Sequence, residues 1–313
     1  MSKTSSLGAA AIGAVFLTTP LAVHAQTAVP IADTGLSVKQ SDMVEEVGSA
    51  ARIDLSGKLR MLSQRVPSAL CAMGAGTAGD SARAILVAAI EEERAILSAL
   101  ADGDDRRGIF GAEDSPKLLR GIERIAEVAD PVLDRATTAS EHGATAEDVT
   151  FVQEQSAEIL TRAKQLVVVI SDKYANPAEL LLADAVAIDI AGRQRMLAQR
   201  MAKDFCLLAS GHGDQALADD LAQTMQTFEA SLDALRLGMP EAGIVEPPTD
   251  AIRFVLEEVE ASWTLLSGLL VTYEEDGGAG QNQRDTVFFG MNALTAKMNT
   301  AVGLYAEASD LDL

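Results

Sequence analysis

The chain has 313 residues, enough for two modest domains, and a formal net charge of −21. Nucleic acid and anionic membrane surfaces would repel so acidic a chain, which excludes both as general partners. Aromatic residues make up only 4% of the sequence, while Ala, Leu, Glu and Asp are abundant, and this balance favours helices over strands. We therefore expect an all-α fold.

The first 25 residues have the pattern of a secretory signal peptide. Lys3 precedes a mostly apolar stretch at residues 9–22, and Val23-His24-Ala25 offers small residues for cleavage after Ala25. An uncleaved membrane anchor is the alternative, but the apolar stretch is shorter than the ~20 residues that a spanning helix needs. Since no later stretch is apolar enough to span, we expect a periplasmic protein that does not insert into the membrane after cleavage.

Eight helical stretches are predicted after residues 26–40, which have no hydrophobic period and form a flexible leader. In the first half the helices are expected at residues 41–73, 81–100, 116–139 and 145–174. In the second half they are expected at residues 178–209, 215–237, 249–273 and 284–308. Short connections favour antiparallel neighbours, so we predict two tandem up-and-down four-helix bundles at residues 41–175 and 176–313.

The third predicted helix carries two proline signals. Ser115 is a good N-cap, and Pro116 suits the first helical position. Pro131 lies inside the same stretch, where it should bend or split the helix.

One segment occurs twice. Residues 53–65 and 188–200 share the pattern Ile-Asp-x-x-Gly-x-x-Arg-Met-Leu-x-Gln-Arg, which we call the box. Cys71 and Cys206, the two cysteines of the chain, are displaced by the same 135 positions as the two boxes. The sequence therefore contains an internal duplication, with one copy in each predicted bundle.

Each box has two faces when it is placed on a helix. Leu and Val residues form one stripe, which can fill the core of its own bundle. The opposite stripe carries Gly57, Arg60, Gln64 and Cys71 in the first copy, and Gly192, Arg195, Gln199 and Cys206 in the second. The simplest packing partner for this stripe is the equivalent stripe of the other copy.

Parallel packing of the two box helices about a pseudo-two-fold axis would make equivalent residues meet. Arg60 would then face Arg195, and we predict a disulfide between Cys71 and Cys206. Two buried, unpaired cysteines are the alternative. A monomer would in this way contain two halves arranged like a dimer.

Two arginines that converge in a seam need a counter-charge. Asp54 and Asp189 are expected to pair along their own helices with Lys58 and Arg193. A small anion held between Arg60 and Arg195 would balance the charge. The box glycines would allow close approach to the backbone, and the box glutamines would offer their side-chain amides.

The distribution of basic residues favours this interpretation. Eight of the 25 basic residues lie in or beside the boxes: Arg52, Lys58, Arg60, Arg65, Arg193, Arg195, Arg200 and Lys203. The alternative is that the two seam arginines bond to carboxylates of neighbouring helices or to helix ends.

The box resembles the N-terminal segment of the PilJ-type domain, the periplasmic sensor module of type IV pilus methyl-accepting transducers. It is also similar to the nitrate-sensing domain of NarX-type histidine kinases, in which the box lies on the first helix of a four-helix bundle. There the dimer binds nitrate or nitrite at the helix seam through its arginine. The resemblance implies that Arg60 and Arg195 are ligand arginines, with Gly57 and Gly192 beside them.

Two departures from that family pattern are apparent. Both half-sites lie in one polypeptide, and the chain carries no kinase or methyl-accepting coiled coil, so it is expected to act through a membrane sensor or transporter. Lys58-Leu59 stands in the first copy where Arg193-Gln194 stands in the second, which indicates that the halves are not equivalent.

These observations favour a periplasmic sensory or binding protein for a small oxyanion, with nitrate or nitrite first. A ligand-free structural or protein-interaction module of a pilus, chemotaxis or envelope system is the alternative. Enzyme activity is not expected, because no haem, di-iron, phosphate-loop or serine-hydrolase motif occurs. No cofactor or metal is expected either, and carboxylate runs such as Glu91 to Glu93 are interpreted as solvated faces.

Overall fold

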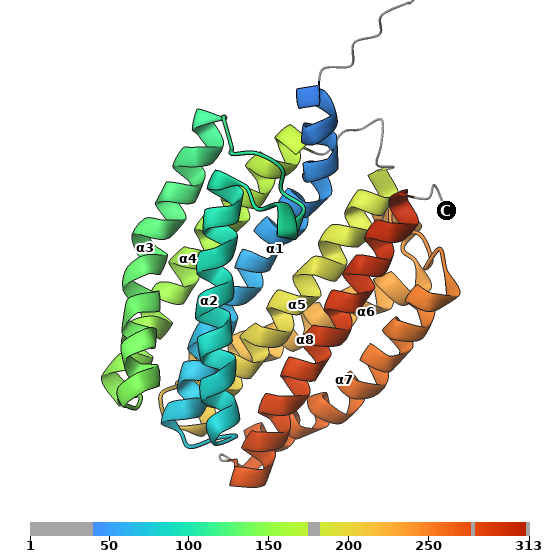
Figure 1. Cartoon of the computed structure of the whole chain (residues 1–313). Coiled ribbons are helices and arrows are strands. Elements are labelled where there is room, and N and C mark those ends of the chain that lie inside the picture. Colours follow the sequence, from blue (N-terminus) through green and yellow to red (C-terminus); the bar gives the residue numbers. More distant parts are fainter. Residues whose placement is uncertain (1–39, 175–181, 277–278, 311–313) are drawn as a thin grey trace, which may run out of the picture. The chain divides into compact units, whose positions relative to one another are not determined.

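The computed structural model describes residues 40–174, 182–276 and 279–310 (Figure 1). The predicted signal peptide and residues 26–39 of the leader lie outside these residues, as does the predicted start of the fifth helix at residue 178. The described helices are α1 (Gln40–Gly74), α2 (Asp80–Asp102), α3 (Pro116–His142), α4 (Ala146–Tyr174), α5 (Leu182–Ala209), α6 (Gln215–Leu237), α7 (Asp250–Asp276) and α8 (Gln281–Asp310). Each matches a predicted helix to within a few residues at its described ends.

The fold is all-α, as predicted. Within the described ranges there is no strand, and the pairing of extended backbone is limited to isolated bridges such as Asp104 with Ile109 and Met239 with Ile244. Helix α1 packs on α2 and α4, and α3 packs on α2 and α4; the second half repeats these contacts among α5, α6, α7 and α8. Two four-helix groups result.

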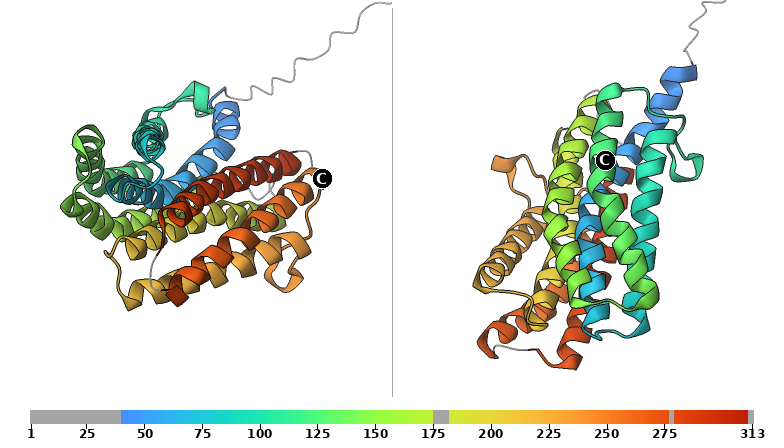
Figure 2. Two further views of the ribbon diagram at one scale, coloured as in Figure 1. Left: turned by 90° about the horizontal axis from the view of Figure 1, so that it is seen from below. Right: turned by 90° about the vertical axis from the view of Figure 1, so that its left-hand side faces the viewer.

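Helices α1 and α5 join the two groups. They pack against each other along much of their length, with α2, α3 and α4 on one side and α6 and α7 on the other (Figure 1). Seen from below, α2, α3 and α4 lie at the upper left and α6 and α7 at the lower right (Figure 2, left). The two helices that carry the boxes therefore form the main contact between the halves, as the two-faced pattern predicts.

Helix α3 begins as its sequence predicts. The Ser115 side chain accepts a hydrogen bond from the Leu118 amide, and Pro116 occupies the first turn. Of the two outcomes predicted for Pro131, the split is wrong, because the helix continues through this residue. Val132 and Leu133, which follow directly, are buried in the bundle, and this packing holds the helix together despite the missing backbone N–H.

The duplication extends to a connection that the sequence did not single out. A short 3-10 turn lies between α2 and α3 at Asp105–Arg107, and its counterpart lies between α6 and α7 at Pro240–Ala242. Both turns end at a glycine in the left-handed region, Gly108 at φ 76° and Gly243 at φ 74°. The same loop shape thus closes the same end of both helix groups.

Candidate functional site at the seam of the two repeats

The two stripes of each box helix separate as expected. On α1 the apolar stripe is buried in its own group; its residues are Leu55, Leu59, Leu62, Val66 and Leu70. On α5 the corresponding Leu197, Met201 and Phe205 are buried. The other stripe of each helix faces the partner helix across the seam.

A disulfide fixes the register of that seam. Cys71 and Cys206 are bonded, with their Cα atoms 6.2 Å apart and 135 residues between them in sequence. This confirms the predicted pairing and excludes the alternative of two free thiols. Because equivalent residues meet, α1 and α5 run parallel.

The two box arginines come together over the two box glycines. A methyl group placed on Gly57 would lie 3.5 Å from Nη2 of Arg60 and 3.7 Å from Nη2 of Arg195. A methyl group on Gly192 would lie 3.5 Å from Nη2 of each arginine. The two guanidiniums therefore share one small region of the seam, and the glycines let them approach the backbone of both box helices.

Two aspartates cross the seam to balance these charges. Arg60 Nη1 donates to Asp189 Oδ1 at 3.0 Å, and Arg195 donates to Asp54 Oδ1 from Nη1 at 3.1 Å and from Nη2 at 3.0 Å. The prediction that Asp54 pairs along its own helix is correct for Lys58, at 3.2 Å, but it is incomplete. Each aspartate lies just beside the seam stripe, so its carboxylate also reaches the arginine of the other copy.

Burial differs sharply between the two kinds of charged group. The Arg60 and Arg195 side chains are 7% and 2% exposed, whereas Asp189 and Asp54 are 35% and 34% exposed. Burial lowers the pKa of Arg60, and the nearby carboxylate of Asp189 opposes this shift. The cations thus lie in the protein interior and the carboxylates lie at its edge, where solvent reaches them.

The box glutamines do not join the arginines. Gln199 Nε2 donates to Thr295 Oγ1 at 2.8 Å and to Asn292 Oδ1 at 3.3 Å, both on α8. Gln64 Nε2 donates to its neighbour Ser63 at 3.1 Å. Both glutamines are buried, but their amide N–H groups are used within their own halves.

Sequence reasoning missed one direct contact of the arginines. Asn299 on α8 accepts a hydrogen bond from Arg195 Nη1 at 2.7 Å. Its counterpart 135 positions earlier is Lys164 on α4. Extending the repeat beyond the boxes would have drawn attention to both residues.

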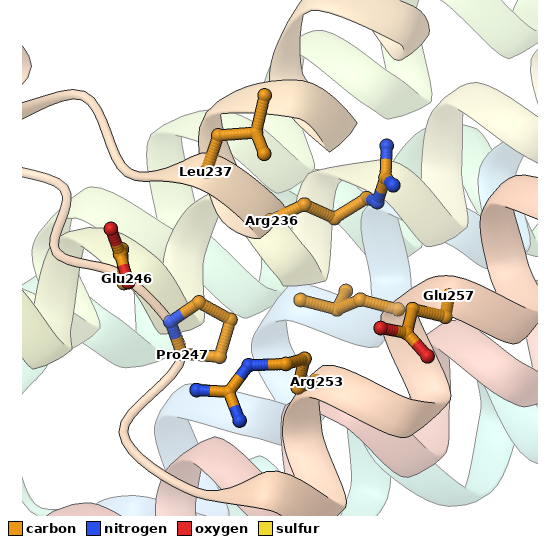
Figure 3. Close-up of a pocket in the computed structure, with 7 residues that line it drawn as sticks. Arg236, Leu237, Glu246, Pro247, Arg253 and Glu257 are labelled. Carbon is orange, nitrogen blue, oxygen red and sulfur yellow. The ribbon is translucent and has the colours of Figure 1, made fainter.

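A cavity on the second half lies apart from the seam. It has a volume of about 280 Å³ and is lined by residues of α6, of the α6–α7 loop and of α7 (Figure 3). Arg236 forms an ion pair with Glu260, and Arg253 forms one with Asp250. None of the six box residues proposed for ligand binding lines this cavity, and both of its arginines already have carboxylate partners.

Across residues 40–174, 182–276 and 279–310, no group of three or more His, Cys, Asp or Glu residues is arranged to hold a metal ion. None of the helices in that part of the chain is both long and apolar enough to cross a membrane.

Comparison with known proteins identifies the family. The family described as "Type IV pili methyl-accepting chemotaxis transducer N-term" matches residues 44–158 and again residues 179–286. Each match begins near the start of the first helix of one group and ends within its fourth helix, as expected for a tandem duplication. A search of the curated proteins found no match. Since the matched segments cover well over half of the chain, this protein belongs to the PilJ family of type IV pili methyl-accepting chemotaxis transducer N-terminal modules, helical modules of sensing and signalling.

Proposed function

We propose that this chain is a periplasmic sensory protein that captures a small oxyanion, nitrate or nitrite first, between Arg60 and Arg195. It then reports the anion to a membrane sensor or transporter. The observation that carries the proposal is the approach of two buried guanidiniums over the open backbone of Gly57 and Gly192. The similarity of the box to the nitrate-sensing domain of NarX-type kinases supports the choice of anion.

The charges around the arginines are consistent with anion capture. Arg60, Arg195, Lys58 and Arg193 share two carboxylates, those of Asp54 and Asp189, in a chain whose net charge is −21. A planar oxyanion offers guanidinium the same acceptor geometry as a carboxylate. An anion arriving from solvent could therefore take over hydrogen bonds that the half-exposed aspartates now accept.

Binding at this place would affect how the halves pack. The arginines lie where α1 meets α5, and a change in their ion pairs would shift one helix against the other, a common form of signalling motion in helical sensors. The disulfide between the same helices is typical of an oxidising compartment such as the periplasm.

Isothermal titration calorimetry with nitrate, nitrite and sulfate tests the proposal. Wild-type protein should give saturable heat with at least one of these anions, and the double variant Arg60→Ala/Arg195→Ala should give none. Absence of saturable heat from wild type with all three anions would contradict the proposal.

Gly57→Ala tests whether anion binding needs a residue without a side chain beside the two arginines. Its methyl group would contact both guanidiniums at ordinary van der Waals distance, and alanine is favoured over glycine in a helix by roughly 1 kcal/mol. We expect the free energy of unfolding to be unchanged or slightly higher, and anion affinity to fall at least about tenfold. Retained affinity would place the anion elsewhere.

A ligand-free interaction module remains the second candidate. The crossed ion pairs favour it, because Asp54 and Asp189 already supply both arginines with a counter-charge. This function predicts that a stable protein partner co-purifies, and that nitrate, nitrite and sulfate leave the melting temperature unchanged.

A further inference from the structure

The two halves of the arginine site are not chemically equivalent. We call Arg60, Asp189, Arg193 and Lys164 the Arg60 half, and Arg195, Asp54, Lys58 and Asn299 the Arg195 half. Each member of one half is 135 positions from its counterpart in the other. The ion pairs correspond, but a lysine on α4 stands where an asparagine stands on α8.

The Arg195 half is internally satisfied. Arg195 donates to Asp54 Oδ1 from two nitrogens, to Asn299 Oδ1 at 2.7 Å and to the Gly192 carbonyl at 3.5 Å. The Asn299 oxygen occupies a place beside the guanidinium that an oxygen of a bound anion would otherwise take.

The Arg60 half has donors without acceptors. Arg60 Nη1 donates to Asp189 Oδ1, but its Nε is buried and has no hydrogen-bond partner within the part of the chain that the structure describes. Asp189 is itself shared with Arg193. Arg60 is therefore less well supplied with acceptors than Arg195, although both side chains are more than nine-tenths buried.

Lys164 adds a further positive charge to this half. The structure gives it no hydrogen bond or ion pair to any described residue. Partial burial lowers the pKa of its ammonium, and the positive charges of Arg200, Arg60 and Arg193 lower it further. Lys164 is the repeat counterpart of Asn299, whose side chain contacts Arg195 at 2.7 Å, so the duplication places Lys164 on the corresponding side of Arg60. Asp189 alone cannot balance Arg60, Arg193 and Lys164.

We infer that the duplicated site binds one anion asymmetrically, on the Arg60 side of the region between Arg60 and Arg195, with Lys164 as a second cationic ligand beside Arg60. The Arg195 half is a structural counterpart in which the Asn299 side chain occupies the ligand's place. This inference rests on the proposed anion-binding function. The ligand class is a small oxyanion able to accept hydrogen bonds from a guanidinium and an ammonium at once.

Two exchanges between the halves test the inference. Lys164→Asn gives the Arg60 half the side chain of the Arg195 half, and Asn299→Lys makes the reverse change. Lys117→Asn, at an exposed position of α3, removes one positive charge elsewhere and serves as the control for net charge. Titration calorimetry on the full chain would use nitrate, nitrite and sulfate, and circular dichroism melting curves without anion would establish that each variant is folded.

Wild type should bind one anion per chain. Lys164→Asn should weaken binding at least about tenfold, Lys117→Asn should leave it unchanged, and Asn299→Lys should allow a second anion to bind. Wild-type affinity in Lys164→Asn, equal weakening by Lys117→Asn, or unchanged stoichiometry in Asn299→Lys would each overturn the inference while leaving the proposed function intact. No binding by wild type would overturn both.

Discussion

Glu93 is a carboxyl group in the core of the first helix group. Its side chain is on the buried face of α2 and the residue is only 1% exposed. The counterpart in the second half is Phe228, which packs against Trp263 with ring centroids 4.7 Å apart. The prediction that Glu91 to Glu93 form a solvated face is therefore wrong for Glu93. Burial, with a smaller contribution from the charge of Asp130, raises its pKa to about 8.

This raised pKa makes stability depend on pH. The unfolded chain loses the Glu93 proton near its ordinary pKa of 4.5, whereas the folded protein keeps it until about pH 8. The stability that the neutral form contributes is full below pH 4.5 and is lost progressively as pH rises to about 8, by an amount on the order of 5 kcal/mol at most.

Glu93→Gln should remove this dependence, because the amide stays neutral. We expect the variant to be more stable than wild type at about pH 8.5 and similar to it near pH 5, as measured by urea unfolding. Glu91→Gln, at an exposed position of the same helix, is the control and should follow wild type. Parallel pH profiles for wild type and Glu93→Gln would contradict this assignment.

At the scale of elements, the α2–α3 connection is fastened to α1 and α4 by one buried carboxylate. Glu113 accepts hydrogen bonds from Arg52 at 3.3 Å, from Tyr174 at 2.7 Å and from Lys173 at 2.8 Å. It also accepts from the backbone amide of Ser115 at 2.8 Å. The α6–α7 connection, which has the same turn, carries Pro247 and Pro248 in the corresponding stretch instead of a glutamate.

Glu113→Ala should loosen the end of the first helix group. The change leaves the buried Arg52 guanidinium without its carboxylate, although Arg52 still donates to the carbonyls of Leu100 and Gly111. We expect a loss of about 2 to 4 kcal/mol in the free energy of unfolding and faster amide hydrogen exchange in residues 103–115. Glu123→Ala, on the exposed face of α3, should change neither quantity; equal effects from both variants would refute the role of Glu113.

At the scale of the whole molecule, the halves are joined by a noncovalent seam and by one covalent bond. The described helices α1 to α8 form one compact unit, and the disulfide between Cys71 and Cys206 closes a segment of 135 residues. A cross-link over so long a segment restricts the unfolded chain strongly.

Cys71→Ser/Cys206→Ser should therefore lower the free energy of unfolding by about 2 to 5 kcal/mol. Urea unfolding of the variant and of wild type in reductant should agree, because both lack the bond. If oxidised and reduced wild type unfold at the same urea concentration, the disulfide does not hold the two halves together against unfolding.

The sequence alone determined the helical elements, the duplication and the register of the seam. These follow from information that is local or repeated: hydrophobic period sets each helix, and the equal displacement of the boxes and cysteines sets which residues meet across α1 and α5. The approach of Arg60 to Arg195 follows from the same register. Their role in anion binding stays a prediction.

Only the tertiary structure decided how the charges are balanced. The crossing of Asp54 and Asp189, the contact of Asn299 with Arg195 and the turning of Gln199 toward α8 each join residues that are far apart in sequence. Whether such side chains meet depends on distances of about 3 Å between helices, which hydrophobic period does not specify. Glu93 illustrates the same limit. The run of carboxylates at residues 91–93 predicted a solvated face, but Glu93 lies on the buried side of α2.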